Sequence, residues 1–215
     1  KLDQLLQSVF LDMFGDPVTN PKGWPECELG DLVRGATDGP HLSPKYSETG
    51  IPFLSTRHIR AGVISWEDLK YISEADAEIQ WKKCRPQRGD ILYTKGGTTG
   101  LAAVVETDEP FAVWVHVALL KTNVERADSA WLAAMLNSKY CYEQSQRYTH
   151  GIANRDLGLK RMVKIKMFHP PLEQQRCYAK FAEKLRLQLD RLIGASQKSS
   201  ALFSTIQARA FAGTL

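Results

Sequence analysis

No part of the sequence limits the possible folds as strongly as the segment that begins at Pro171. It predicts one continuous helix, because proline is tolerated at the first helical position and Glu173 suits the positive end of the helix dipole. Apolar or small residues then recur at spacings of three and four, which is typical of a coiled-coil seam, although the middle of this seam is polar. Roughly 40 helical residues would span on the order of 60 Å, so we expect the helix to extend beyond a compact domain and to pack against a partner. The expected helix-packing residues are Leu185, Leu189, Leu192, Phe203 and Ile206.

The first residues predict a second, shorter helix, which Gly15 and Pro17 bring to an end. Residues 1–14 also resemble residues 198–211. A repeat of this kind would mean that the natural protein holds two such units or pairs two copies, although two amphipathic helices can also match by chance. Because the chain does not begin with Met, we expect it to be a piece of a longer protein. The aligned residues are Lys1, Leu5, Leu6, Ser8, Val9 and Phe14 with Lys198, Leu202, Phe203, Thr205, Ile206 and Phe211.

Short apolar runs between Gly, Pro and Asp fill the region from Glu28 to about Val124 and predict strands. These runs are IPFLS, GVISW, DILYT, AAVVE and FAVWVHVALL. WLAAMLNSKYCYEQSQ predicts a helix from Trp131, and the alternation in LKRMVKIKMF predicts a final strand over 159–168. The sequence therefore predicts an α+β fold with an N-terminal helix over 1–15, a strand-rich globular domain over 16–169 and a long coiled-coil-type helix over 170–215.

Composition and cysteine usage indicate which partners and which cellular compartment to expect. The net charge of +4 permits a polyanionic partner without demanding one. The four cysteines form no CxxC pair, so we expect buried thiols in a reducing cytoplasm, with a disulfide left open. The sequence shows neither an apolar run of membrane-spanning length nor a signal-peptide pattern, so we expect a cytoplasmic protein without a membrane partner.

Several motifs suggest catalysis but fail in context. The HPPL sequence at 169–172 resembles the loop of an amino-methyltransferase, but Leu172 has no π face on which a flipped base could stack. In KGGTTG (95–100) the lysine precedes the glycines, so a hairpin turn explains the glycines better than a phosphate-binding P-loop does. Asp68 and Lys70 match a magnesium-nuclease tripeptide that is too short to be specific, in a segment that predicts a solvated acidic turn or helix. No pair of histidines has a metal-ligand spacing, and we expect His116 to be a core or sheet residue.

Basic residues, in contrast, gather in three clusters of the strand-rich domain. The first covers 147–166, the second follows IPFLS at 57–60, and the third runs from Lys82 to Lys95. Cations of this kind bind phosphates, and polar side chains at a groove edge read bases. A solvated surface explains any one of these residues, but the three clusters together favour DNA binding.

Taken in order, the motifs resemble one half of the DNA-specificity (S) subunit of type I restriction-modification systems. The features that carry the resemblance are FGDPVTNPKGW, WPECELGDL, GIPFLSTRHIRAGVI, RGDILYTKGGTTG and HGIANRDLGLKRMVKIKMFHPPLEQQ, followed by the long helix. Each motif alone is weak, and the ordered set covers nearly the whole chain.

The resemblance implies a non-catalytic subunit without a cofactor of its own. In this family a target-recognition domain reads one half of a bipartite site in double-stranded DNA. The long helix pairs antiparallel with a second half, or with a second copy, and sets the half-site spacing. Methyltransferase (M) subunits, which carry S-adenosylmethionine, dock on the helices, and the restriction (R) subunit joins through the complex. The double proline would then direct the spacer helix out of the recognition domain.

The base-contacting residues of the family vary with the target, so we choose candidates by their chemistry and their loop positions. Arg57 and Arg60 would suit guanine, and Asn154 would suit adenine. Two other classes stay open: a catalytic nuclease or methyltransferase, and a helical interaction module without DNA contact. The DNA-binding candidates are Thr37, Asp38, His41, Thr56, Arg57, His58, Arg60, Lys95, Thr98, Thr99, His150, Asn154 and Arg155.

Overall fold

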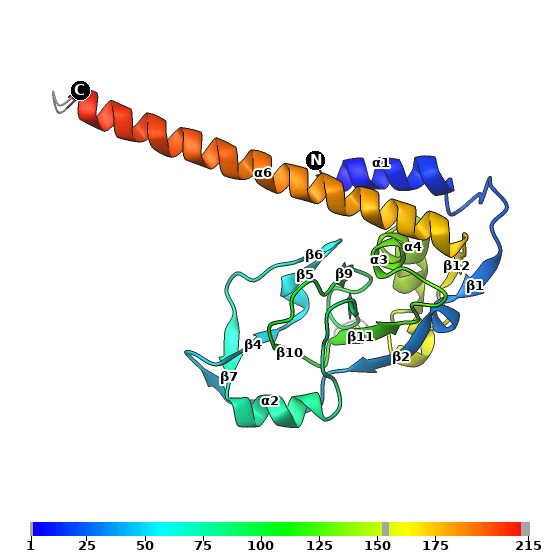
Figure 1. Cartoon of the computed structure of the whole chain (residues 1–215). Coiled ribbons are helices and arrows are strands. Elements are labelled where there is room, and N and C mark those ends of the chain that lie inside the picture. Colours follow the sequence, from blue (N-terminus) through cyan, green and yellow to red (C-terminus); the bar gives the residue numbers. More distant parts are fainter. Residues whose placement is uncertain (1, 152–154, 212–215) are drawn as a thin grey trace.

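One long helix projects from the body formed by the rest of the chain (Figure 1). The structure is a computed structural model that describes residues 2–151 and 155–211. Helix α6 (Leu172–Phe211) is 40 residues long and begins one residue after Pro171, which confirms the predicted long helix. Helices and several sheets together confirm the α+β class.

An antiparallel sheet of four strands in the order β2-β11-β8-β9 lies at the centre of the body. Its strands are β2 (Val33–Asp38), β11 (Val117–Thr122), β8 (Ile91–Thr94) and β9 (Ala102–Val104). Strands β8 and β11 are buried almost throughout, because side chains of this sheet pack into two different hydrophobic clusters. The KGGTTG turn joins β8 to β9, which confirms the predicted hairpin.

A second four-stranded sheet, in the order β10-β4-β7-β3, extends the body away from α6 (Figure 1). Its strands are β10 (Ala112–Val113), β4 (Ile51–Leu54), β7 (Lys70–Ile72) and β3 (Tyr46–Ser47). Helix α2 (Glu74–Trp81) packs on this sheet and is capped by the Ser73 side chain, which accepts from the backbone N–H of Asp76. Two smaller pairs complete the strands: β5 (Ile59–Arg60) with β6 (Val63–Ile64), and β1 (Glu26–Glu28) with β12 (Lys166–Phe168).

Two predicted elements prove to be divided. The helix predicted from Trp131 consists of α3 (Ser129–Leu136) and α4 (Lys139–Tyr148), because Ser138 ends one helix and caps the next by accepting from the N–H of Cys141. The predicted final strand consists of the short helix α5 (Leu159–Met162) and strand β12. The predicted alternation of buried apolar and exposed polar side chains holds only for β12 and the residue before it, where Ile165 and Met167 are buried.

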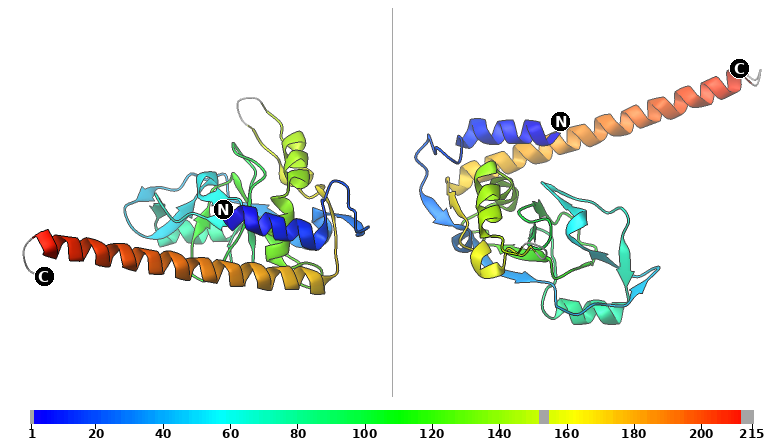
Figure 2. Two further views of the ribbon diagram at one scale, coloured as in Figure 1. Left: turned by 90° about the horizontal axis from the view of Figure 1, so that it is seen from above. Right: turned by 180° about the vertical axis from the view of Figure 1, so that it is seen from behind.

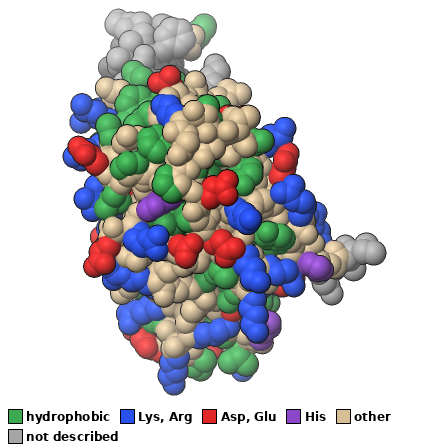
Figure 3. All heavy atoms as spheres, turned by 90° about the vertical axis from the view of Figure 1, so that its right-hand side faces the viewer, with side chains coloured by type: hydrophobic (Ala, Val, Ile, Leu, Met, Phe, Trp, Pro, Cys, Tyr) green, Lys and Arg blue, Asp and Glu red, His purple; other side chains and the backbone are tan. Residues whose placement is uncertain are grey.

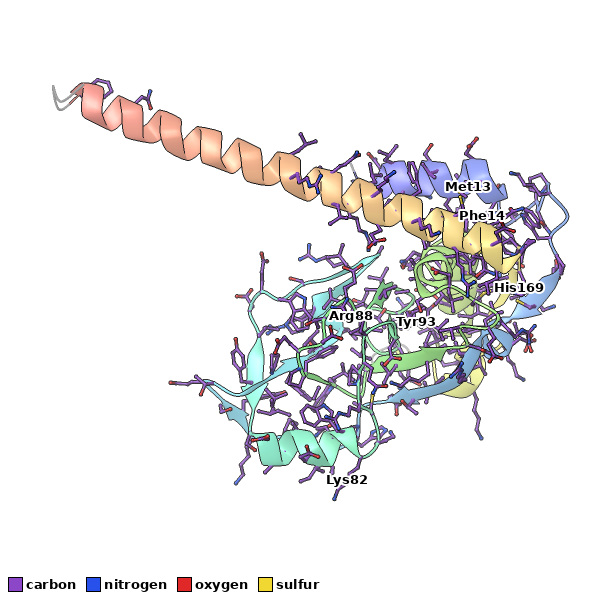
Figure 4. All side chains as sticks on the ribbon, in the orientation of Figure 1. Met13, Phe14, Lys82, Arg88, Tyr93 and His169 are labelled. Carbon is purple, nitrogen blue, oxygen red and sulfur yellow. The ribbon has the colours of Figure 1, made fainter. Side chains whose placement is uncertain are left out.

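Helix α1 (Leu2–Phe14) confirms the predicted N-terminal helix and lies along the first half of α6, running in the opposite direction (Figures 1 and 2). Phe10 and Phe14 of α1 form an aromatic cluster with Phe168 and Tyr178, with ring centroids 5.0–6.5 Å apart. Figure 4 shows Phe14 and His169 at the same corner of the molecule, where α6 leaves the body.

Beyond this cluster α6 has few neighbours from its own chain. Leu185 and Leu189 are half-buried, whereas Leu192 is 67% exposed. The side chains of Phe203 and Ile206 lie outside the described part of the chain, so pairing through the helix stays a prediction. Helix α6 has the length of a membrane span, but neither it nor any other described helix contains an 18-residue stretch apolar enough for one.

Candidate nucleic-acid interface

Several candidate DNA-binding residues meet at one end of the central sheet, where β2 and β8 end and β11 begins. Asp38 pairs with Ala118 and Thr94 pairs with Val117, so the loops that follow Asp38 and Thr94 leave the sheet at the same edge. The loop after β8 is the glycine turn, residues 95–101, with positive φ at Gly97 and Gly100. Glycine tolerates this backbone region, which allows the tight reversal into β9.

A second segment, made of residues 148–151 and 155–157 and called the hairpin below, lies against the glycine turn. His150 and Asp156 exchange backbone hydrogen bonds of 3.0 and 2.8 Å, which closes this hairpin. The N–H of Gly97 donates to the carbonyl of Arg155 at 3.0 Å, and the N–H of Leu157 donates to the carbonyl of Lys95 at 2.8 Å. The backbone therefore joins two segments that are far apart in the sequence into one surface.

Buried charges underlie this surface. Lys95 and Asp38 are only 6% and 7% exposed, and Lys95 Nζ lies 3.3 Å from Asp38 Oδ2 and 2.9 Å from Asp156 Oδ1. Lys83 Nζ holds the other Asp38 oxygen at 2.5 Å. Asp38 and Lys95 were predicted to contact DNA, but their charged groups are buried and paired within the protein, so neither presents a free charge at the surface.

Thr99 is also a structural residue. It is 2% exposed, and its hydroxyl lies 3.1 Å from that of Thr149, while Gln146 Nε2 donates to its carbonyl at 3.0 Å. Thr99, which was predicted to contact DNA, is therefore buried in the protein, whereas its neighbour Thr98 is exposed. Thr37 is half-buried within β2, where it pairs with Leu119.

The second basic cluster lies elsewhere on the body. His58, which was predicted to contact DNA, is only 3% exposed, and its Nδ1 accepts from the N–H of Ser55 at 2.8 Å. Burial lowers the pKa of His58, which keeps its ring neutral. Arg57 is exposed and donates to the carbonyl of Asp68 at 2.6 Å, and Thr56 is half-buried. Arg60 is exposed on β5.

The hairpin of β5 and β6 faces the long helix rather than the glycine turn. Arg186 of α6 donates to the carbonyl of Gly62 at 3.2 Å, between these two strands. The structure thus brings together the candidates at the sheet end and places Arg57 and Arg60 on a separate part of the surface.

The first basic cluster is the most exposed of the three. Figure 3 shows many Lys and Arg side chains on the face of the molecule turned toward the viewer. Most residues of the third cluster are paired within the protein: Lys83 with Asp38, Arg88 with Asp108 at 2.9 Å, and Arg85 over the Trp81 ring. The exposed cations of the first cluster are Arg147, Arg155, Lys160, Lys164 and Lys166.

Three histidines add exposed polar rings to the sheet end and the loops near it. His41 and His150 are exposed, as predicted for loop residues. His116 is exposed as well, which contradicts its predicted place in the core or sheet, and its ring fits against Gly96, where a Cβ atom would collide with it. The exposure of His116 could not be predicted, because FAVWVHVALL predicts one strand. In the structure, residues 114–116 form a loop between β10 and β11. Asn154 lies outside the described residues.

The motifs that suggested catalysis have structural roles. His169 donates from its backbone N–H to the carbonyl of Pro25 at 2.7 Å, and its Nε2 lies 2.7 Å from the carbonyl of Arg126. Asp68 is an exposed turn residue with φ of 51°. Within residues 2–151 and 155–211, His, Cys, Asp and Glu form no group that could hold a metal ion.

The cysteines are free thiols. Cys84 and Cys141 are buried as predicted, Cys27 is partly buried, and Cys177 is exposed on α6, which contradicts the prediction for that residue. Burial raises the pKa of Cys27 and of Cys84 to about 11 and that of Cys141 to about 12.

Comparison with known proteins identifies relatives of this architecture. The family model described as "Type I restriction modification DNA specificity domain" matches residues 21–196. No curated protein matches the chain. Among solved structures, the HsdS subunit from Thermoanaerobacter tengcongensis is similar, with 20% identity and a TM-score of 0.57 over 100% of this chain and 51% of that one.

Two further structures are similar to a comparable degree. The S subunit of the type I restriction-modification system from M. genitalium has 14% identity and a TM-score of 0.58 over 94% of this chain and 52% of that one. A structure of a type I restriction-modification system, described for its complex assembly and conformational transition, has 19% identity and a TM-score of 0.61 over 100% and 52%. At these identities the likeness shows a shared fold, and the chain spans about half the length of each.

Proposed function

The chain belongs to the family of type I restriction modification DNA specificity domains, and from this premise we propose that it recognises one half of a bipartite DNA site. The family match over residues 21–196 is the observation that carries the proposal. It extends from the loop after α1 into α6, so it takes in the globular body and the start of the long helix together.

The proposed DNA surface is the sheet end with its glycine turn and hairpin. Exposed Lys and Arg beside the hairpin would bind phosphates, and exposed polar side chains would read base edges. We retain as candidates His41, Arg57, Arg60, Thr98, His150 and Arg155, all of which are exposed. His116 joins them because the structure exposes its ring beside the glycine turn.

The long helix is proposed to join this body to the rest of a restriction-modification complex in the cytoplasm. It would pair with a second half or a second copy of the chain, since much of its length has no neighbour from the described body. The M subunits would dock on the helices and supply S-adenosylmethionine and the methyl transfer, and the R subunit would join through that assembly. The family is described as a DNA specificity domain, and this description supports a non-catalytic role for the chain.

The test is to sequence the modified bases of the host genome with and without the gene. We expect deletion to abolish methylation at one bipartite motif, and the natural gene supplied in trans to restore it. An unchanged methylation pattern in a host that expresses the M subunit would overturn the proposal. If the purified chain alone methylated DNA with S-adenosylmethionine, or cleaved DNA with Mg²⁺, the catalytic alternative would replace it.

A further inference from the structure

The geometry points to Lys95 as a positioning residue that fixes the glycine turn and the hairpin residues 148–151 and 155–157 as one recognition unit without itself touching DNA. This inference rests on the proposed function and deepens it. It assigns specificity to a charge network in which Asp38 and Lys95 are buried and Lys83, Asp156 and Arg161 are partly exposed, rather than to surface residues alone.

Lys95 lies where three segments of the chain meet. Its N–H donates to the carbonyl of His116 at 2.9 Å, and its own carbonyl accepts from the N–H of Leu157 at 2.8 Å. Its ammonium group bridges Asp38, at the end of β2, and Asp156, on the hairpin. The backbone and side chain of a single residue therefore connect β2, the segment before β11 and the hairpin to the glycine turn.

The charges alternate along the network. Lys83 and Lys95 flank Asp38, and Lys95 and Arg161 flank Asp156, with Arg161 Nη2 3.8 Å from Asp156 Oδ2. Loss of the central cation would leave Asp38 buried with one partner and would free Asp156 from the sheet. Breaking a buried ion pair is strongly unfavourable, so the sheet end would rearrange around Asp38, and the hairpin would be held to the glycine turn by backbone hydrogen bonds alone.

Burial distinguishes this role from a phosphate contact. The Lys95 side chain is only 7% exposed, and both carboxylates occupy its ammonium group. A lysine that binds a phosphate releases a counterion, so removing it lowers the salt dependence of binding for every DNA sequence. A lysine that only positions the loops should change discrimination between sequences and leave the salt dependence unchanged.

The experiment measures DNA binding by the complete natural protein in complex with its M subunits. One duplex carries the methylated motif identified by modified-base sequencing, and a second has the same composition in scrambled order. Lys95→Met and Asp156→Asn are compared with Lys82→Met, an exposed lysine at the end of α2 that takes no part in the network (Figure 4). Asp156→Asn is the safer variant for folding, because the Asp156 side chain is 46% exposed.

We expect Lys95→Met and Asp156→Asn each to lower the preference for the motif at least tenfold, with the slope of log K against log salt unchanged. The double variant should be no worse than either single variant, because both changes break one network. Lys95→Arg should restore part of the preference, and Lys82→Met should behave as the natural protein.

Two results would overturn this inference and leave the proposed function standing. One is a salt slope that falls by about one with equal weakening on both duplexes, which would make Lys95 a phosphate contact. The other is a preference that stays within twofold in Asp156→Asn. A natural complex that shows no preference for any motif would overturn the proposed function and this inference with it.

Discussion

Gln175 Oε1 accepts a hydrogen bond of 2.9 Å from the backbone N–H of Asp128, and this bond ties the first turn of α6 to the N-terminus of α3. Gln175 is fully buried, and its Nε2 donates to the carbonyls of Pro170 at 2.8 Å and of Arg126 at 3.3 Å. The amide therefore satisfies three backbone groups at the point where the long helix leaves the body. This arrangement gives the PPLEQQ sequence a physical reason: the prolines start the helix, and the second glutamine fixes its direction.

We predict that Gln175→Leu destabilises the protein by about 2–4 kcal/mol, because it leaves the N–H of Asp128 and the carbonyl of Pro170 without a partner and the carbonyl of Arg126 with His169 alone. The measurement is the free energy of unfolding in urea. Gln174→Leu is the matched control, since Gln174 is the exposed neighbour on the same turn, and it should change stability by no more than about 0.5 kcal/mol. Equal effects of the two substitutions would refute the role assigned to Gln175.

Thiol reactivity should separate the four cysteines. The thiolate is the reactive form, and a raised pKa keeps Cys27, Cys84 and Cys141 protonated at neutral pH. Cys177 is exposed on α6, so we predict that an alkylating reagent at pH 7.5 modifies this residue at least tenfold faster than the others. Mass spectrometry of the digested protein over time measures each rate, and Cys177→Ser should remove the fast phase. Rapid labelling of Cys141 in folded protein would contradict its burial.

The secondary structure could be predicted best where one local signal decided it. The long helix begins next to the double proline, and strands β8, β9 and β11 of the central sheet coincide with apolar runs between turn residues, whereas β2 (VRGATD) has no such run. The errors arose where distant contacts decide the backbone. Arg161 of α5 donates from Nε to the carbonyl of Tyr148 at 2.8 Å, a contact that the alternating pattern of 159–168 could not reveal.

The candidate site could be predicted only as a set of loops. Polar residues in the glycine turn and in the hairpin were identified, and the structure joins these two segments. Sequence could not separate Lys95 and Asp38, which pair with each other inside the protein, from Arg155, which is exposed. All three are charged residues in or next to predicted loops. Only the fold brings Asp38 and Lys95 within 3.3 Å of each other.

The stability of the protein should depend on pH through His58. Burial lowers the pKa of His58 in the folded state, whereas the unfolded chain titrates near the ordinary value of 6.5. The unfolded state therefore gains a proton first as the pH falls, so His58 stabilises the fold above pH 6.5 and this contribution is lost below it. We predict that the natural protein loses its stability advantage over His58→Gln between pH 8 and pH 5. Urea unfolding at several pH values measures the difference, and an advantage that grows on acidification would show that the pKa is raised instead.

Two glycines of the turn that joins β8 to β9 should differ in their tolerance of a side chain. Both Gly97 and Gly100 have positive φ, so alanine is strained at either position, at a cost of about 1–2 kcal/mol. A Cβ atom at Gly97 would meet nothing within 4 Å, whereas at Gly100 it would collide with the Oγ atom of Ser145, which is fully buried. We therefore predict that Gly97→Ala costs about 1–2 kcal/mol of unfolding free energy and that Gly100→Ala costs at least about 1 kcal/mol more.

The collision can be tested separately from the backbone strain. Adding Ser145→Ala removes the hydroxyl that a Cβ at Gly100 would meet, so the double variant should recover part of the loss caused by Gly100→Ala. The same Ser145→Ala change should give no such recovery to Gly97→Ala, because open space surrounds that position. Urea unfolding of the five variants and the natural protein provides both comparisons. Equal coupling of Ser145 to the two glycines would mean that the turn relaxes as a whole, and the contact between Gly100 and Ser145 would then have no special part in holding the turn against α4.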